Sequence, residues 1–505
     1  MLKKIRVTLA FLFFLLLTLL FLDFTGTLHL WFEWLAKLQL IPAILAVNAA
    51  IVVFLVLLTL IFGRIYCSVI CPLGVLQDGV SRLAGRRKGK KNRFRHSKAK
   101  TWLRYSVLLL FIIVLVAGVS VVASLLDPYA AYGRIGTNIF APVYRLGNNL
   151  LAWLAERVDS YAFYATDVWI KSWISLGIAA VTLIVVAVLA WRNGRTYCNT
   201  ICPVGTILGF LSRFSIFRPT FDTAKCTKCG LCERSCKASC IDSKNMTIDQ
   251  SRCVTCFNCI EKCNFGAMKY APRKIGSKKN QPVVQNGTVE MSSSENGVTR
   301  RSFLTIAGTF AVASTIKAQQ LHVDGGLADI EDKKIPDRKT PIAPPGADSL
   351  SHMKQHCTAC QLCISACPNH ILRPSGKLST LMQPEMSYER GYCRPECTAC
   401  SQVCPTGAIK RITTAEKSAI SIGYAVWIKN SCIVNSDELQ CTACEHHCPT
   451  GAIVLVARDP ENEKSLKIPA IDKELCIGCG ACEYHCPSRP FSAIYVEGNV
   501  KHHSI

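Results

Sequence analysis

The sequence has no histidine within its four long apolar stretches, which cover residues 5–22, 39–62, 102–126 and 174–191. Bis-histidine ligation of a haem inside these stretches is therefore excluded. The chain also lacks a Cys-x2-Cys-His motif, which excludes ordinary covalent c-type haem. We expect no haem cofactor, so any redox chemistry must use another carrier.

Acidic residues are missing from residues 81–100, where ten Lys or Arg occur. Basic residues also precede the first apolar stretch, whereas the loop 127–171 balances both signs. Cytoplasmic loops of membrane proteins carry such an excess of Lys and Arg, so this pattern accounts for the formal charge of +24. A nucleic-acid partner is not expected, because the basic residues flank apolar stretches and lack interleaved aromatic residues.

Each apolar stretch approaches the roughly 20 residues that cross a bilayer as a helix. We therefore predict an α-helical unit of four transmembrane helices, duplicated 2+2, over residues 1–215 of a multi-pass protein in a bacterial inner membrane. The positive-inside pattern places both ends of this unit in the cytoplasm. The first stretch could instead be a cleaved signal peptide, but no small-x-small site follows it before Trp31, which favours a retained helix.

A repeat with a constant offset of 131 links the ends of the second and fourth stretches. Residues 63–74 read Gly-Arg-Ile-Tyr-Cys-Ser-Val-Ile-Cys-Pro-Leu-Gly, and residues 194–205 read Gly-Arg-Thr-Tyr-Cys-Asn-Thr-Ile-Cys-Pro-Val-Gly. Cysteines four apart share one face of a helix, so two pairs brought together could supply four ligands. The alternatives are a further metal site, two redox-active dithiols, or buried small residues. The four cysteines are Cys67, Cys71, Cys198 and Cys202.

Twenty-nine cysteines would suggest disulfides in a small secreted protein, but here 24 fall in six groups of four. The regular spacing is Cys-x2-Cys-x2-Cys-x3-Cys, which predicts a [4Fe-4S] cluster whose fourth ligand comes from the partner group. Zinc ribbons pair two Cys-x2-Cys knuckles without a third cysteine, so zinc is not favoured.

Residues 216–272 are predicted to form a cytoplasmic α+β ferredoxin with two [4Fe-4S] clusters. Cys240 lies outside the regular spacing and could replace Cys236 as a ligand, although the spacing favours Cys236. The predicted ligands are Cys226, Cys229, Cys232 and Cys263 for one cluster, and Cys253, Cys256, Cys259 and Cys236 for the other.

Residues 351–505 are predicted to form a second α+β ferredoxin-like domain with four clusters, in which every group ends in Cys-Pro. The first and last groups are regular, and the two between them have a stretched first gap. Spacing alone allows sequential pairing of the groups. The groups are Cys357, Cys360, Cys363 and Cys367; Cys393, Cys397, Cys400 and Cys404; Cys432, Cys441, Cys444 and Cys448; and Cys476, Cys479, Cys482 and Cys486.

The two ferredoxins are separated by three segments of different composition. Residues 273–298 are polar and read as a flexible linker. Residues 299–318 begin Thr-Arg-Arg-Ser-Phe-Leu and continue with a short apolar run, which predicts either a twin-arginine signal or a fifth anchor. Residues 319–350 contain four prolines and read as a spacer. A working signal implies the twin-arginine translocation machinery as a partner and places residues 351–505 in the periplasm.

Together these motifs resemble two families of ferredoxins. Residues 1 to about 275 are similar to NapH-like membrane ferredoxins, and residues 299 to 505 are similar to NapG-like exported ferredoxins. The duplicated Cys-x3-Cys-Pro, the six groups, the twin-arginine stretch and Pro344-Pro345-Gly346-Ala347 carry the resemblance. It implies a quinol dehydrogenase that feeds periplasmic nitrate reductase, although relatives serve nitrous-oxide respiration, methylamine oxidation and cytochrome-oxidase maturation.

The resemblance also implies a nested pairing of the four C-terminal groups. The stretched gaps of the inner groups favour treating the second and third as partners. The implied sets are Cys357, Cys360, Cys363 with Cys486; Cys476, Cys479, Cys482 with Cys367; Cys393, Cys397, Cys400 with Cys448; and Cys432, Cys441, Cys444 with Cys404.

The expected function is iron-sulfur electron transfer from membrane quinol to a periplasmic cytochrome or terminal reductase. Asp127 and Arg134 are the candidate catalytic residues, since a carboxylate could take a proton and an arginine could bind a quinone oxygen. Their alternative role is structural, with Asp127-Pro128 forming a turn. The alternative function is a redox maturation factor that activates a metalloenzyme through the Cys-x3-Cys-Pro pairs.

Overall fold

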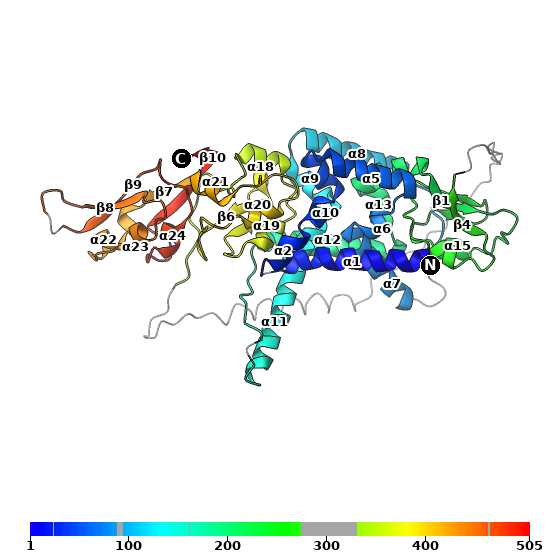
Figure 1. Ribbon diagram of the computed structural model, residues 1–505, viewed down its shortest axis with the longest axis horizontal. Coiled ribbons are helices and arrows are strands. Elements are labelled where there is room, and N and C mark those ends of the chain that lie inside the picture. Colours follow the sequence, from blue (N-terminus) through cyan, green and yellow to red (C-terminus); the bar gives the residue numbers. More distant parts are fainter. Residues whose placement is uncertain (24, 88–93, 161, 274–330, 463–464) are drawn as a thin grey trace, which may run out of the picture. The chain divides into compact units, whose positions relative to one another are not determined.

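The computed structural model describes residues 1–23, 25–87, 94–160, 162–273, 331–462 and 465–505 (Figure 1). The chain divides into two compact units, of which the first contains residues 1–273, 335–488 and 492–505 and includes the helices and both cysteine-rich modules. The predicted twin-arginine stretch 299–318 lies outside the described residues, as does the predicted linker apart from residue 273.

Among the described residues, two helices have the length and apolar composition needed to cross a membrane. They are α1 (Leu2–Leu22) and α12 (Trp173–Asn193), each of 21 residues. At a rise of about 1.5 Å per residue, each is about 30 Å long, the thickness of a hydrocarbon core.

The other two apolar stretches are interrupted, so the predicted unit of four transmembrane helices is not confirmed. The stretch 39–62 forms α4 (Leu40–Leu45) and α5 (Ala49–Phe62), separated at Val47, whose φ is +52°. The stretch 102–126 forms α8 (Thr101–Val116) and α9 (Ser120–Leu126), separated at Gly118, whose φ is +71°. A left-handed residue ends a helix, which leaves α5 and α8 shorter than a full span.

The outward faces of these helices are apolar, and polar side chains lie inside. Exposed side chains on α1 and α12 include Phe11, Leu12, Val181 and Ile184. The largest fully buried side chains of the unit include Arg64, Arg104, Arg134 and Arg195. This distribution is the inverse of that expected for a water-soluble helical bundle.

The repeated sequence folds in the same way twice. In the first copy, α5 ends at Gly63 and is followed by α6 (Tyr66–Val69) and α7 (Pro72–Arg87). In the second copy, α12 ends at Gly194 and is followed by α13 (Thr196–Thr200) and α14 (Pro203–Leu211). Both glycines have positive φ, a conformation that glycine adopts without strain.

The loop predicted over 127–171 contains helices. Asp127 accepts hydrogen bonds from the backbone N–H groups of Tyr129 and Ala130 and thereby caps α10 (Pro128–Ile135). Proline at the first position of α10 agrees with the structural reading of Asp127-Pro128. A π-helix, η1 (Gly136–Phe140), and α11 (Ala141–Glu156) follow. Every residue of α10 is buried, so this helix is an internal element of the unit.

The first cysteine-rich module consists of two small antiparallel sheets and two short helices. Strand β1 (Phe217–Phe221) pairs with β4 (Met268–Pro272), and β2 (Ile241–Asp242) pairs with β3 (Thr247–Ile248). The helices are α15 (Leu231–Arg234) and α16 (Asn258–Glu261).

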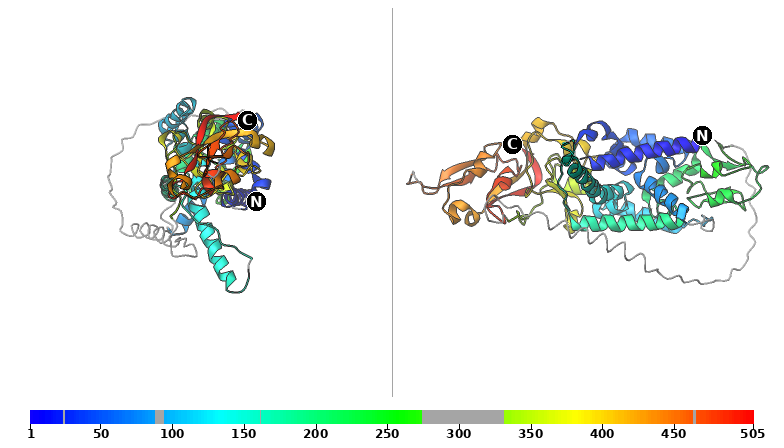
Figure 2. Two further views of the ribbon diagram at one scale, coloured as in Figure 1. Left: turned by 90° about the vertical axis from the view of Figure 1, so that its left-hand side faces the viewer. Right: turned by 90° about the horizontal axis from the view of Figure 1, so that it is seen from below.

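The second cysteine-rich module has the same α+β character, with short helices between two-stranded sheets (Figures 1 and 2). Its antiparallel pairs are β5–β6, β7–β10 and β8–β9. In chain order its elements are α18 (Leu350–His356), α19 (Leu362–Ala366), β5 (Leu372–Pro374), η5 (Leu378–Thr380), β6 (Pro384–Met386), α20 (Ala399–Val403), α21 (Thr414–Ala419), β7 (Ile420–Trp427), η6 (Lys429–Ser431), α22 (Ile433–Ser436), α23 (Ala443–His446), β8 (Ile453–Ala457), β9 (Lys467–Ile471), α24 (Ala481–His485) and β10 (Ile494–Ser504).

The two modules contact opposite ends of α1. At its start, Lys3 forms an ion pair with Glu261 of α16. Near its end, α1 packs against α19 of the second module. The remaining short helices of the helical unit are α2 (Thr27–Phe32), α3 (Trp34–Lys37) and η2 (Ser212–Phe214).

Candidate metal centres

The four regular cysteine groups share one backbone conformation. In each, the residues on both sides of the second cysteine have positive φ, and a short helix carrying the third cysteine follows. Alternating right- and left-handed residues turn successive N–H groups into a concave, anion-binding nest, which is common at iron-sulfur sites. These loops therefore fit a negatively charged cluster. The flanking residues are Lys228 and Gly230, Thr255 and Phe257, Ala359 and Gln361, and Gly478 and Gly480.

Single metal ions do not fit as well. Among the described residues, no group of three or more His, Cys, Asp or Glu converges closely enough to hold one metal ion. Thiolates at the corners of a cubane are spaced around a larger group of atoms. The cysteines of each set are therefore suited to a cluster.

In the first module, the fourth cysteine of the first group joins the second group. Burial raises the pKa of Cys259, and the neighbouring thiolates include Cys256, Cys253 and Cys236. Burial likewise raises the pKa of Cys232 to about 11, with Cys229 and Cys226 as its thiolate neighbours. Cys236 therefore lies near Cys253, Cys256 and Cys259, although Cys232 of the other set is also a neighbour of Cys259, and the crossed assignment stays a prediction.

Cys240 lies within the same set. Its Sγ is 3.5 Å from the Sγ of Cys236, and hydrogen bonding with Cys240 lowers the pKa of both Cys236 and Cys253. Cys240 is therefore close enough to replace Cys236 as a ligand. The assignment of Cys236, rather than Cys240, as the fourth ligand stays a prediction.

In the structure, the cysteines of the second module are grouped differently from the nested pairing that the resemblance implies. Burial raises the pKa of Cys363, and its thiolate neighbours are Cys360, Cys357, Cys404 and Cys400. For Cys400 the neighbours include Cys393 and Cys367. The first and second groups thus exchange their fourth cysteines, so Cys404 takes the place that nesting gives to Cys486.

The third and fourth groups exchange in the same way. Burial raises the pKa of Cys444 to about 12, with Cys441 and Cys486 as neighbours, and Cys448 is a neighbour of Cys479. The packing explains this arrangement, because α19 packs against α20 and α23 packs against α24. The observed sets are Cys357, Cys360, Cys363 with Cys404; Cys393, Cys397, Cys400 with Cys367; Cys432, Cys441, Cys444 with Cys486; and Cys476, Cys479, Cys482 with Cys448.

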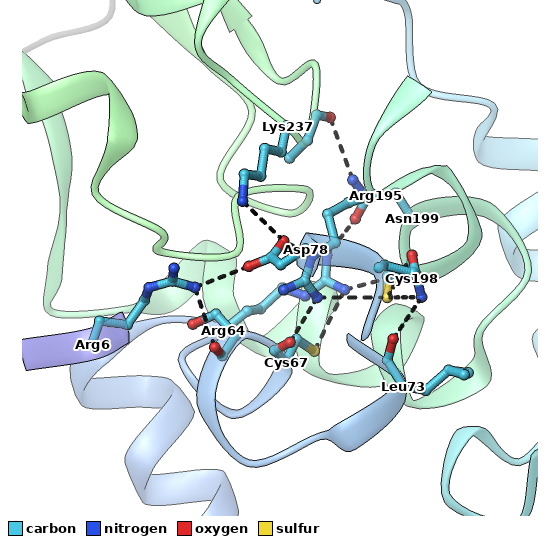
Figure 3. A network of polar contacts seen from close by, with 12 residues as sticks. Arg6, Arg64, Cys67, Leu73, Asp78, Arg195, Cys198, Asn199 and Lys237 are labelled. Carbon is cyan, nitrogen blue, oxygen red and sulfur yellow. Dashed lines mark hydrogen bonds and ion pairs between the residues drawn. The ribbon is translucent and has the colours of Figure 1, made fainter. Parts of the chain in front are cut away.

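The two Cys-x3-Cys pairs meet inside the helical unit. All four cysteines are buried, and burial raises the pKa of Cys202, whose thiolate neighbours are the other three. Two arginines connect the repeats in a reciprocal manner (Figure 3). The guanidinium of Arg64 donates to Cys198 O at 3.2 Å, and that of Arg195 donates to Cys67 O at 2.7 Å. The structure therefore brings the two cysteine pairs together, which is the condition for the predicted set of four ligands.

The arginines of this four-cysteine site also approach its sulfur atoms. Arg64 Nη2 lies 3.8 Å from Cys67 Sγ, and Arg195 Nη1 lies 3.8 Å from Cys198 Sγ. Gln77 Nε2 lies 3.3 Å from Cys198 Sγ. Sequence reasoning missed these residues, although the two Gly-Arg pairs belong to the repeat and could have indicated a shared role.

A single carboxylate serves three cations beside the site. Asp78 pairs with Arg195 Nε at 2.8 Å, Arg6 Nη1 at 3.0 Å and Lys237 Nζ at 3.4 Å (Figure 3). Burial alone would raise the pKa of the Asp78 carboxyl, but these cations hold it well below its usual range. Asp78 is therefore ionised at neutral pH.

The two candidate catalytic residues lie in and beside α10. Asp127 is buried as the cap of that helix, and burial raises its pKa to about 6. Arg134 is fully buried and donates to Ser124 O at 3.0 Å. Neither lines any of the pockets found among the described residues. Their quinol role stays a prediction.

A small pocket lies where α1, η1, α11 and α12 meet Ser365 in the first cysteine group of the second module. Its volume is about 30 Å³, enough for water-sized occupants. Lys171 Nζ donates to Ile364 O at 2.9 Å, between Cys363 and Cys367. Thr137 Oγ1, Arg145 Nε and Trp169 Nε1 are buried there without a hydrogen-bond partner among the described residues. The lining includes Phe21, Thr137, Asn138, Arg145, Trp169 and Lys171.

Two family models match the chain. A 4Fe-4S binding domain matches residues 45–91 and 173–221, which contain the two halves of the repeat. A 4Fe-4S dicluster domain matches residues 356–408 and 439–489. Each dicluster match joins neighbouring cysteine groups, in agreement with the sequential pairing.

Several curated proteins are similar to parts of the chain. An uncharacterised protein of Methanocaldococcus jannaschii, MJ0749, is 35% identical over 102 residues, which cover 20% of this chain and 41% of that protein. A second protein of that organism, MJ0750, is 29% identical over 280 residues, covering 54% and 94%. The ferredoxin-type protein NapF of Escherichia coli is 37% identical over 86 residues, covering 17% and 49%. No solved structure matches the chain.

These comparisons support an iron-sulfur electron-transfer protein with ferredoxin-type domains and several [4Fe-4S] clusters. The number of six clusters and the division into NapH-like and NapG-like parts are not confirmed by them and stay predictions.

Proposed function

We propose that this protein oxidises membrane quinol and passes the electrons through its clusters to an acceptor on the outer side of the membrane. The pocket beside Lys171 carries this proposal, because it connects the apolar helical unit to the first cysteine loop of the second module, through Ser365 in its lining and the hydrogen bond from Lys171 to Ile364 O. The charges of Cys367 and Cys363 both act on Lys171, and these cysteines belong to different sets. Quinol releases two electrons, whereas each cluster takes one, so a site beside two clusters suits that chemistry.

The surface of the helices supports a membrane location. Large apolar side chains are exposed along α1 and α12, and α11 exposes Val143, Leu150 and Trp153. A contiguous exposed apolar surface on a folded protein marks contact with lipid or with another protein. The contacts of α1 with Glu261 and α19 support a model in which α1 crosses the bilayer and the two modules lie on opposite sides. The basic residues near Lys3 favour the cytoplasm for the first module.

A quinol headgroup entering here would have to widen the pocket, whose closed volume of about 30 Å³ fits only water, but it would meet side chains of suitable chemistry. Phe21 and Trp169 provide apolar ring surfaces, while Lys171 and Arg145 provide donors to a quinone oxygen. Burial and the neighbouring Arg145 lower the pKa of Lys171 to about 8. The unpartnered donors Thr137 Oγ1 and Trp169 Nε1 would gain partners from a ligand with oxygen atoms.

The test adds a short-chain quinol to membranes under anaerobic conditions. The rate of cluster reduction is measured as the loss of the clusters' visible absorbance. Lys171→Met is expected to slow this reduction about tenfold, because a hydrogen bond from a charged donor is worth about 1.5–3 kcal/mol. Lys410→Met is the matched control, since Lys410 is exposed and pairs with Asp348 away from the pocket.

Asp127→Asn, measured alongside, separates the pocket from the residues that the sequence singled out. A slow D127N with a normal K171M would move the quinol site to α10. Intact clusters that no quinol reduces would contradict the dehydrogenase and favour the maturation factor.

A further inference from the structure

The contacts of α1 raise the question of how electrons pass from one module to the other. The helix is about 30 Å long, and the modules contact its opposite ends. Electron transfer rates fall exponentially with the distance between redox centres. A connection across the helical unit therefore requires a centre between the modules.

The four-cysteine site occupies such an intermediate position. On one side, Arg64 Nη1 donates to Ser251 O at 3.0 Å, and Arg195 N donates to Lys237 O at 2.9 Å. Ser251 and Lys237 neighbour Cys253 and Cys236, two ligands predicted for one cluster of the first module. The site therefore directly adjoins the first module.

On its other side, the site faces α10. The charge of Asp127 at the start of α10 acts on both Tyr66 and Tyr197, which precede Cys67 and Cys198. The neighbouring charge of Cys360 in the second module contributes to the raised pKa of Tyr129 in α10, so these two residues lie close together. Buried α10 thus lies between the four-cysteine site and the first cluster loop of the second module.

The geometry of the site is that of one shared centre. Each arginine belongs to one repeat and bonds the cysteine backbone of the other. Gly74 and Gly205 occupy equivalent positions, and a Cβ at either would overlap the carbonyl of Cys67 or Cys198 and approach the crossing arginine. The two halves are consequently held close together, and all four cysteines are buried between them and their surroundings.

The charges around the site are unbalanced. Asp78 neutralises Arg195, but the equivalent position in the second repeat is Gly209, so Arg64 has no carboxylate partner among the described residues. Arg64 Nε and Arg195 Nη2 are buried without a hydrogen-bond partner there. Buried cations are stable only near negative charge. The site therefore requires an anionic occupant, which neutral thiols do not provide.

We propose that Cys67, Cys71, Cys198 and Cys202 together hold one iron-sulfur cluster, which connects the two ferredoxin modules electrically. The 4Fe-4S binding model matches each half of the repeat separately, whereas the geometry draws two ligands from each half into a single centre. The connecting role rests on the proposed function, but the ligand set does not. In each transfer one electron arrives from one module and one leaves to the other, without a bond being formed or a proton released.

The test measures iron and acid-labile sulfide per chain in the full-length protein, purified anaerobically in detergent. Three variants are compared: C67A/C71A, C198A/C202A, and all four cysteines changed. Ser68→Ala is the matched control, because Ser68 is fully buried beside Cys67 and is not a proposed ligand. Each half-variant is expected to lose as much iron as the fourfold variant, roughly four atoms for a cubane, while the control loses none.

Half-variants that each lose half of the iron lost by the fourfold variant would indicate two separate sites and overturn the proposal. Unchanged iron in the fourfold variant would overturn it in favour of dithiols.

If the cysteine variants fail to fold, Arg64→Met replaces them, because it leaves the thiols in place. It is expected to lower the midpoint potential of one centre by removing a positive charge, and a titration identical to wild type would overturn the proposal. These readouts need no quinol, so a failure of the proposed function leaves them interpretable.

Discussion

At the scale of single residues, the repeat is maintained by small side chains as much as by cysteines. Gly74 and Gly205 allow the arginine of one repeat to reach the backbone of the other. Each glycine lies beside a carbonyl that a Cβ would overlap, and Arg195 Nη1 would lie 2.7 Å from a Cβ at Gly74. The requirement is steric, because neither glycine has a positive φ.

Gly74→Ala and Gly205→Ala are each expected to lower the free energy of unfolding by about 1–3 kcal/mol, the usual cost of overpacking a close contact. Gly79→Ala is the control, because nothing lies within 4 Å of a Cβ there. In the middle of α7, that alanine should be neutral or stabilising by about 0.5–1 kcal/mol. Thermal unfolding in detergent measures all three, and equal midpoints for Gly74→Ala and Gly79→Ala would refute the steric argument.

Asp127 predicts a pH-dependent stability. Its carboxyl has a pKa of about 6 in the folded protein because it is buried, against about 3.9 in an unfolded chain. Between these values the folded state holds a proton that the unfolded state releases. The contribution to stability is therefore present at low pH and is lost as pH rises toward 6, by about 1.4 kcal/mol per unit.

Asp127→Asn isolates this effect, because asparagine also caps helices but does not titrate. Relative to wild type, the variant should become more stable by about 1.4 kcal/mol between pH 5 and pH 7, nearly all of it below pH 6. Unfolding midpoints at pH 5, 6 and 7 give the difference directly. A constant difference across this range would mean that Asp127 does not titrate there.

At the scale of elements, patterns that are local in the sequence predicted more than those that depend on packing. The offset of 131 predicted two equivalent cysteine pairs, and both begin in a short helix after a glycine. The shared helix face that the spacing suggested is absent, because Cys71 and Cys202 lie beyond the ends of α6 and α13. The apolar content of 39–62 and 102–126 did not reveal their interruptions, since the left-handed turn at Val47 is not evident from a β-branched residue. The segment 127–171 was predicted as a loop with balanced charges. It nevertheless contains α10 and η1, because burial in the helical unit stabilises helices there.

The pairing of the cysteine groups was beyond sequence reasoning, because spacing fixes each loop but not its partner. The packing of α19 against α20 and of α23 against α24 determines the pairing. Likewise, no spacing rule links Arg64 to Cys198, which are brought together only when the repeats pack.

Cys404→Ser distinguishes the sequential from the nested arrangement. In the structure Cys404 shares a set with Cys357, Cys360 and Cys363, so the variant should make these three more reactive toward a thiol-alkylating reagent. Nested pairing instead predicts increased labelling of Cys432, Cys441 and Cys444. Mass spectrometry of the labelled peptides reads both sets in one experiment. Cys240→Ser serves as the control, since it should leave the labelling of both sets unchanged.

At the scale of the whole molecule, the question is on which side of the membrane each module lies. The apolar surface, the position of α1 and the charge pattern all bear on it. Lys3 and Glu261 connect the start of α1 to the first module, and α19 contacts the helix near its end. Under the proposed function, in which α1 spans the membrane, two modules at its opposite ends imply that the second is exported. Translocation of a domain folded around its clusters requires a route that accepts folded proteins, which is the role predicted for Arg300-Arg301.

A reporter fused after Ile505 should therefore be active outside the cytoplasm in a host with the twin-arginine machinery and inactive in a host without it. Changing Arg300 and Arg301 to lysine should abolish export while retaining the charge, because the signal depends on arginine itself. The chain contains a second arginine pair, Arg86-Arg87, and its change to lysine is the matched control that should leave export intact.

Export independent of Arg300-Arg301 would assign translocation to the helical unit alone, since opposite placement of the modules would then need no signal. A reporter that stays in the cytoplasm in both hosts would place all clusters on one side. In that case α1 would not span the bilayer, the outer acceptor would be excluded, and the maturation factor would become the better account of the same clusters.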